Sequence, residues 1–144
     1  MCCNRERRCR KGFSLVEVMI VIVIIGLLAG VVTVNVRSYL VRAKRNTARQ
    51  EIATIVKGLN TFYGSYDRYP TNEEGLKALV EPTEKLPEPP LEGPAVLTDP
   101  WGRPYQYNAP GTNGPFEVIS YGADGRAGGE GAAADIHSDQ LKEQ

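Results

Sequence analysis

The most prominent hydrophobic feature is a run of about 20 apolar residues near the amino end, residues 13–34, interrupted only by the charge of Glu17. A helix of this length crosses a bilayer hydrocarbon core of ~30 Å. A cleaved secretory signal has a shorter apolar region, commonly ~7–15 residues, followed by a small-residue cleavage site. A buried strand, which the many Val and Ile residues favour, is also shorter. The run therefore predicts a membrane-spanning helix.

Beyond this run, apolar residues recur at the three-four spacing of an amphipathic helix. The repeating positions are Ile52, Ile55, Val56, Leu59, Phe62, Tyr63 and Tyr66. Pro70 disfavours a helical conformation at Tyr69. We therefore expect one helix from Phe13 or Ser14 to about Tyr66, whose first half faces lipid or a partner and whose second half packs on a globular domain.

The pattern then changes to short elements. Thr71 and Glu74 have the spacing of a capping box for a short helix over residues 75–80. Six prolines between residues 81 and 100 exclude regular structure over most of that stretch. We expect it to form a loop laid over the long helix.

A pair of short strands is predicted after the loop. Tyr105 and Tyr107 share one face of a strand, and residues 116–121 read as its antiparallel partner across a turn at residues 109–115. Trp101 is expected to anchor the core over the helix. One long helix followed by a small antiparallel sheet predicts an α+β fold.

The charge is balanced overall, with 17 basic and 17 acidic residues, but it is unevenly distributed. Residues 1–12 hold five basic residues against one acidic residue, so the remainder is net negative. By the positive-inside rule the amino end stays in the cytoplasm and the body is exported. An acidic exported body argues against nucleic-acid binding. The basic stretch at residues 37–49 is then a solvated helix face.

All three cysteines, Cys2, Cys3 and Cys9, lie in the basic head, so the rest of the chain can form no disulfide of its own. Their spacing lacks the C-x2-C pairs and histidines of a zinc site. An exported body must therefore be held together by other means.

Glu17 is unusual because a carboxylate in a membrane helix costs a few kcal/mol and normally has a partner and a purpose, unless it reaches water at the interface. It follows the segment Lys-Gly-Phe-Ser-Leu-Val at residues 11–16. This segment resembles the class III signal of type IV prepilins and type II secretion pseudopilins. The resemblance implies that a prepilin peptidase cuts between Gly12 and Phe13 and methylates the new amino group. Glu17 would then pair with the amine of a neighbouring subunit, since two buried charges are tolerable only as a pair.

A glycine-rich loop lies near the carboxyl end, at residues 121–131, and Asp135 follows it. Such a loop can bring carbonyl oxygens and carboxylates, including Asp124, around one hard cation of the Ca²⁺ type. It lacks the spacing of an EF-hand and the Gly-Lys-Ser/Thr ending of a phosphate loop. An ordinary surface loop is the alternative.

The order of several motifs resembles the major pseudopilins of type II secretion systems, the G-type subunits, over residues 11–136. The motifs are Arg-Tyr-Pro-Thr at 68–71, Glu-Gly-Leu at 74–76, Asp-Pro-Trp-Gly at 99–102, Tyr-Gln-Tyr at 105–107, Gly-Ala-Asp-Gly at 122–125, Gly-Gly-Glu-Gly at 128–131 and Asp-Ile at 135–136. The resemblance implies a pilin-like α+β fold with a structural calcium.

Carried over residue by residue, Asp124 and Asp135 would supply side-chain oxygens to that calcium and Tyr121 a backbone carbonyl, with Gly129 a further candidate. The chain departs from the family at residues 132–134, where three alanines replace more polar residues, and in the tail after residue 136. His137, in that tail, is expected to be solvated.

These interpretations imply a structural protein. The resemblance implies a leader at residues 1–12, a transmembrane half-helix at 13–34 and a periplasmic domain at 35–144. It also implies a homopolymer, the pseudopilus, that drives export of folded proteins across the bacterial outer membrane from an inner-membrane anchor. Expected partners are the lipid bilayer, prepilin peptidase, minor pseudopilins and the inner-membrane platform, with no nucleic acid.

Three other functions are less compatible with the sequence. A type IV major pilin or competence pseudopilin often closes its carboxyl region with a disulfide. This chain has no cysteine beyond residue 9 to form one there. A membrane-anchored enzyme is disfavoured because no nucleophile-and-base arrangement or paired-carboxylate motif is recognisable. A DNA-binding protein would depend on the basic stretch alone.

Overall fold

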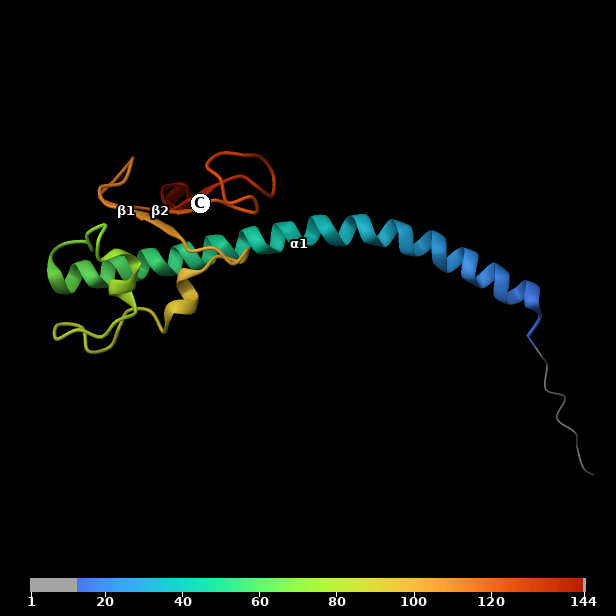
Figure 1. Ribbon diagram of the computed structural model, residues 1–144, viewed down its shortest axis with the longest axis horizontal. Coiled ribbons are helices and arrows are strands. Elements are labelled where there is room, and N and C mark those ends of the chain that lie inside the picture. Colours follow the sequence, from blue (N-terminus) through green and yellow to red (C-terminus); the bar gives the residue numbers. More distant parts are fainter. Residues whose placement is uncertain (1–12, 144) are drawn as a thin grey trace, which may run out of the picture. The chain divides into compact units, whose positions relative to one another are not determined.

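The structure, a computed structural model, describes the backbone of residues 13–143 and their side chains apart from residues 31–35, 142 and 143. The chain divides into two compact units, Met1–Ser38 and Tyr39–Gln144. One long helix, α1 (Leu15–Tyr66), begins in the first unit. The second unit contains the later elements, namely η1 (Gly75–Leu79), η2 (Pro94–Leu97), β1 (Gln106–Asn108), β2 (Glu117–Ser120), β3 (Ile136–His137) and η3 (Asp139–Glu143). Figure 1 labels α1, β1 and β2.

The predicted long helix is confirmed, and it ends at Tyr66 as expected. The predicted leader at residues 1–12 lies outside the described residues. Among the residues that the structure does describe, no helix is long and apolar enough to cross a membrane. Residues 31–35, which belong to the predicted span, are among those whose side chains are not described.

The core of the second unit is built on one stripe of α1. Its members, spaced three and four residues apart, are Ala48, Ile52, Ile55, Leu59 and Phe62, all at most 3% exposed. They pack with residues from η1, the proline-rich loop and the sheet, including Leu79, Leu91, Val118 and Ile136. Each large aliphatic side chain contributes ~1.5–3 kcal/mol by leaving water. The predicted amphipathic pattern is confirmed at these positions, although Tyr63 is 43% exposed.

The helix stops at a left-handed residue. Asp67 has φ 56°, and its amide donates to the Tyr63 carbonyl at 2.8 Å, which closes the last turn. The two hydrogen bonds of the predicted capping box are confirmed: the Thr71 amide donates to Glu74 at 2.8 Å, and the Glu74 amide donates to the Thr71 hydroxyl at 3.3 Å. They close the turn before the short helix, which begins only at Gly75 and whose N-cap residue, Glu74, makes no side-chain cap hydrogen bond. The short helix that follows is of the 3-10 type.

The proline-rich loop lies over the helix, as predicted. Leu91, in the middle of the loop, is 3% exposed, and its amide donates to the Leu79 carbonyl at 3.0 Å. A Cβ placed on Gly58 would lie 3.3 Å from the Leu91 side chain. Because Gly58 has no side chain, the Leu91 side chain of the loop packs directly against the backbone of α1.

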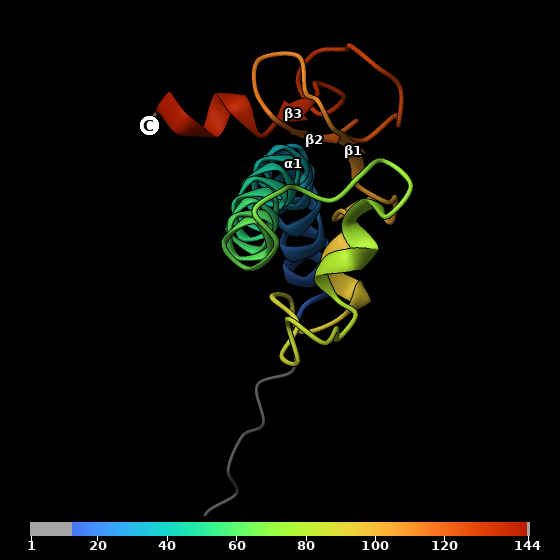
Figure 2. The same ribbon diagram turned by 90° about the vertical axis from the view of Figure 1, so that its left-hand side faces the viewer.

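The three strands form an antiparallel sheet in the order β1-β2-β3. Figure 2 shows the strands on one side of the second half of α1, with η1 and η2 on another side. The predicted pairing of β1 with β2 is confirmed, with Tyr107 opposite Val118. Tyr105 is buried and Trp101 is half-buried against the core, as expected for its anchoring role.

The third strand was not predicted, and the expectation of a solvated tail at His137 is wrong. Ile136 pairs with Ser120 and is 2% exposed. The next residues extend this contact, because the Ser138 amide donates to the Val118 carbonyl at 2.9 Å and the Ser138 hydroxyl accepts from the Val118 amide at 3.0 Å. The tail completes the sheet because β2 would otherwise leave these backbone groups unpaired.

The Arg68–Glu74 pair leads to a pH prediction. Two hydrogen bonds of 2.7 and 2.8 Å join them, and this contact, helped by the Thr71 amide, lowers the pKa of Glu74 from 4.5 to about 2. Because the folded-state pKa lies below the unfolded one, the pair stabilises the fold above pH 4.5, and this contribution is lost as the pH falls toward 2. The effect is small, since both side chains are more than a third exposed.

We expect Glu74→Gln to be less stable than wild type at pH 7 and the difference to disappear across this window, measured by urea unfolding of the full chain in detergent. Glu73→Gln, which removes an adjacent exposed carboxylate, serves as the control. A difference that persists unchanged at low pH would contradict the assignment.

Candidate functional site

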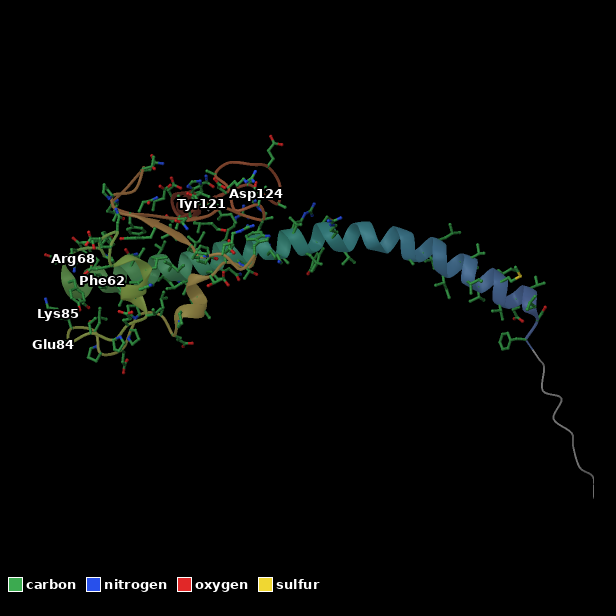
Figure 3. All side chains as sticks on the ribbon, viewed as in Figure 1. Phe62, Arg68, Glu84, Lys85, Tyr121 and Asp124 are labelled. Atoms are coloured by element: carbon green, nitrogen blue, oxygen red, sulfur yellow. The ribbon has the colours of Figure 1, made fainter. Side chains whose placement is uncertain are left out.

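The predicted functional residues form two groups, one at the amino end of α1 and one in the loop between β2 and β3. Of the first group, Gly12 lies outside the described residues, whereas Phe13 and Glu17 are exposed at the start of the chain that the structure describes. Glu17 lies in the first turn of α1, where a negative charge is favourable for the helix dipole. The second group, Tyr121, Asp124, Gly129 and Asp135, lies in the glycine-rich loop, which in the structure spans residues 121–135 between β2 and β3. Figure 3 labels Tyr121 and Asp124 of this loop.

The glycine-rich loop folds back on itself immediately after β2. The Gly125 amide donates to the Tyr121 carbonyl at 3.2 Å, and the Ala123 amide donates to the Ala132 carbonyl at 3.0 Å. Gly129 has φ 95°, and a Cβ there would lie only 2.8 Å from the Ala133 carbonyl oxygen. Glycine is therefore required at this position both by the backbone conformation and by the close approach of the returning strand.

Two arginines bind carbonyl oxygens of this loop. Arg45 on α1 donates from Nη1 to the carbonyls of Gly131 at 2.6 Å and Ala134 at 2.9 Å. Arg103 donates to the Gly122 carbonyl at 2.8 Å. Burial under the loop, together with repulsion from Arg49, lowers the pKa of Arg45.

These arginine contacts were not predicted. Arg45 is part of the basic stretch that was interpreted as a solvated face, and it is separated from its two acceptors by 86 and 89 residues. No local pattern distinguishes it from the exposed Arg42 or Lys44 nearby. The loop is thus anchored to the helix by a cation of the protein itself.

A buried carboxylate, that of Asp99, is connected to the start of the loop by hydrogen bonds. Asp99, 5% exposed, accepts from the amides of Trp101 at 3.0 Å and Arg103 at 2.9 Å and from the Ser120 hydroxyl at 2.8 Å. The Ser120 hydroxyl in turn accepts from the Gly122 amide at 3.3 Å. The Asp-Pro-Trp-Gly turn and the start of the glycine-rich loop therefore share one hydrogen-bond network.

The two predicted acidic ligands have different surroundings. Asp124 is exposed, and its Oδ1 accepts from the Arg126 amide at 3.2 Å. The Asp135 side chain is 13% exposed, and its Oδ2 accepts from the Gly128 amide at 2.8 Å. Its Oδ1 is buried and has no hydrogen-bond donor among the described residues.

The buried Oδ1 of Asp135 is the observation that bears on a cation in this loop. A buried carboxylate oxygen without a donor is costly, and a metal ion is one of the groups that can compensate it. The same loop offers backbone carbonyls, and oxygen atoms are the ligands that Ca²⁺ prefers. The residues present are therefore compatible with the calcium that the sequence resemblance implies.

A long helix packed on a small antiparallel sheet, with a glycine-rich loop after the central strand, defines the pilin-like class of subunits. The family model for type II secretion system protein G matches residues 35–139, and the model for the prokaryotic N-terminal methylation motif matches residues 7–33. The chain therefore belongs to the type II secretion system protein G family.

Relatives agree with this assignment over nearly the whole chain. Type II secretion system core protein G of Pseudomonas aeruginosa is 42% identical over 136 residues, which cover 91% of this chain and 96% of that protein. The core protein G of Vibrio cholerae is 40% identical over 136 residues, which cover 92% of this chain and 93% of that protein.

A solved structure shows a similar fold. The crystal structure of the major pseudopilin from the type 2 secretion system of enterohaemorrhagic Escherichia coli is 31% identical to this chain, with a TM-score of 0.52. The match covers 67% of this chain and 86% of the solved one. The predicted fold class is thereby confirmed. The family and its relatives also support the secretion role over the type IV pilin and competence alternatives.

The arginine contacts lead to a stability prediction. We expect Arg45→Ala to lower the free energy of unfolding by about 1–2 kcal/mol, since hydrogen bonds from a charged donor are lost and one acceptor is partly buried. Amide hydrogen exchange should increase in the loop at residues 122–134. The exposed Arg42→Ala is the matched control, and equal effects of the two substitutions would contradict a specific role for Arg45.

Proposed function

We propose that this chain is the major structural subunit of a type II secretion pseudopilus and that it acts by polymerising in the periplasm. In this proposal residues 1–12 are a leader removed on the cytoplasmic side, residues 13–34 anchor the subunit in the inner membrane, and residues 35–144 form the periplasmic domain. Growth of the polymer pushes folded proteins across the outer membrane. The function is assembly, in agreement with membership of a family of structural subunits.

The observation that carries the proposal is the surface of the first part of α1. Large apolar side chains are 47–79% exposed there, and they occur on every side of the helix. They are Leu15, Val16, Val18, Met19, Ile20, Val21, Ile22, Val23, Ile24, Ile25, Leu27 and Leu28, and Phe13 just before the helix is 82% exposed. A helix that is apolar all round is covered by lipid or by other helices. Both environments follow from the proposal: lipid before assembly and neighbouring subunits afterwards.

Glu17 supplies the assembly register. Removal of the leader would create a cationic amine on Phe13, four residues before the Glu17 carboxylate. In a packed apolar filament neither charge is tolerable alone, so the carboxylate of one subunit would neutralise the amine of another. The match to the N-terminal methylation motif over residues 7–33 supports processing at the Gly12–Phe13 bond. The prepilin peptidase, the inner-membrane platform and minor pseudopilins are the partners that this route requires.

We also infer that the glycine-rich loop holds a structural Ca²⁺. Asp124 and Asp135 would provide carboxylate oxygens and Tyr121 a carbonyl oxygen, with Gly129 as a further candidate ligand. The buried Oδ1 of Asp135 without a donor supports this inference. Bound to the folded state only, the ion would stabilise the domain by mass action.

The assembly proposal is tested at Glu17. We expect Glu17→Ala to be inserted and processed but to assemble poorly, because a neighbouring amine then lacks its counter-charge. Intact-mass analysis of the membrane fraction should show wild type and variant starting at methylated Phe13. Filament yield from overproducing cells should fall well below that of wild type.

Met19→Leu is the control, since it alters the same apolar surface without changing charge. Filaments of Glu17→Ala at wild-type yield would contradict the register role. A mature membrane form that retains residues 1–12 would contradict the processing step.

The calcium inference is tested by thermal melting of the full chain in detergent, in millimolar CaCl₂ and in chelator. We expect a higher melting temperature with calcium, equivalent to about 2.7 kcal/mol when free calcium is ~100 times its dissociation constant. Asp124→Asn and Asp135→Asn should each remove most of this difference. Magnesium should substitute poorly because it demands a tighter octahedron.

Glu92→Gln removes an exposed carboxylate from the proline-rich loop and should leave the calcium response unchanged. If wild type and both aspartate variants melt together with and without several millimolar calcium, the loop is held by its arginine and backbone contacts alone.

A further inference from the structure

A second group of metal-ligating side chains lies at the far end of the sheet. It consists of Glu117 on β2, His137 on β3 and Asp139 at the start of η3, whose potential ligand atoms lie within 4.8 Å of one another. None of these residues was predicted as a site. The group is distinct from the glycine-rich loop, and the register of β2 with β3 brings its members together.

The register places all three side chains on one face of the sheet. Ile119 pairs with His137, so continuing the antiparallel register places Glu117 opposite Asp139. Alternate residues of a strand share a face, so residues 117 and 119 lie on the face opposite Val118. Val118 is fully buried in the core with α1. The group therefore lies on the side of β2 that faces away from the helix.

The electrostatics of this group are unbalanced. Glu117 on β2 and Asp139 at the start of η3 bring two carboxylates close together, and like charges so close are unfavourable without a cation between them. Glu117 is nearly buried, with 10% of its side chain exposed, and the imidazole Nδ1 of His137 lies 2.9 Å from its Oε1. The Thr112 hydroxyl donates to its Oε2 at 3.0 Å.

Asp139 is only partly compensated. Its Oδ2 accepts from the Asn113 side chain at 2.7 Å, a contact that lowers the pKa of Asp139. Its Oδ1 is buried and receives no hydrogen bond from the described residues. A buried acceptor without a donor inside a His–Glu–Asp group is an independent indication that a cation belongs there.

We propose that Glu117, His137 and Asp139 bind one divalent transition-metal ion of the zinc type, with water completing the coordination. One imidazole nitrogen and two carboxylate oxygens form a borderline donor set that suits Zn²⁺, whereas Ca²⁺ prefers oxygen alone. Tetrahedral coordination with bonds of ~2 Å needs donor atoms ~3.3 Å apart. The potential ligand atoms lie within 4.8 Å of one another, so side-chain rotation has to bring the most widely separated pair closer together.

A neighbouring carboxylate is placed to orient the imidazole. Asp135 Oδ2 lies 4.0 Å from Nε2 of His137, on the opposite side of the ring from Glu117. Metal-binding histidines commonly direct their second nitrogen toward such a group. The ion would link β2 to the tail, where β3 contributes only two residues of strand pairing. Its role would be to hold the carboxyl end on the sheet.

The test is zinc titration of the full chain in detergent, by competition with a chromophoric chelator. Cys2, Cys3 and Cys9 are replaced by Ser throughout, because their thiolates would bind zinc themselves. Saturating calcium is present in one series and absent in another. We expect one zinc per chain in both series, and at least about tenfold weaker binding in His137→Gln and in Asp139→Asn.

Asp124→Asn is the matched control, since it removes a carboxylate from the neighbouring loop and leaves the three ligands intact. It should bind zinc like the parent chain even if its calcium response is lost, so the two metal proposals fail separately. The visible spectrum of bound Co²⁺ gives a second readout, in which the intense bands of tetrahedral coordination should be lost in His137→Gln.

Circular dichroism without metal establishes that each variant is folded, and if His137→Gln is not, Asp139→Asn decides. The proposal is overturned if the parent binds no zinc at submillimolar concentration. It is equally overturned if a folded ligand variant binds as tightly as the parent, or if Asp124→Asn loses zinc as fully as the ligand variants do.

Discussion

The second unit depends on one hydrophobic stripe of α1. Nine residues in three strands are too few to form a stable sheet alone, since isolated small sheets are marginal in water. The sheet becomes stable because Val118 and Ile136 pack on the stripe that includes Ile55 and Leu59. The proline-rich loop packs on the same helix through Leu91, directly over Gly58. A single helix thus serves as one wall of the core for the sheet, η1 and the proline-rich loop.

Where the hydrophobic stripe ends, hydrogen bonds take over the attachment of loops to α1 and to the sheet. Among the side chains that the structure describes, Ala48 is the last buried apolar residue toward the amino end, and one turn earlier Arg45 replaces apolar packing with hydrogen bonds to loop carbonyls. On the sheet side, Asp99 accepts a hydrogen bond from the Ser120 hydroxyl, and this hydroxyl accepts one from the Gly122 amide at the start of the loop. No cysteine lies beyond residue 9, so these contacts take the place that a disulfide would have in ordering the carboxyl end.

The sequence predicts the features that have a local signal. The helix end at Tyr66, the Thr71–Glu74 capping box and the pairing of β1 with β2 all follow from periodicity or fixed spacing, and all are confirmed. The contacts of Arg45 span more than 80 residues and have no such signal. A two-residue strand such as β3 is too short to show an alternating pattern, so His137 could not be distinguished from a solvated tail residue. Its environment is decided by β2, whose backbone needs a second partner.

The placement of Asp135 connects the loop to the tail. Its Oδ2 accepts from the Gly128 amide within the loop and also faces the imidazole of His137, while its backbone leads directly into β3. Ile136 then pairs with Ser120, the residue that supports the start of the same loop. Both ends of the glycine-rich segment are therefore held by the pairing of β2 with β3, and the Ala123–Ala132 hydrogen bond and the Arg45 contacts hold the segment between them. Ordering of the loop and attachment of the carboxyl end are for this reason one cooperative event, in which either side lowers the conformational entropy that the other must lose.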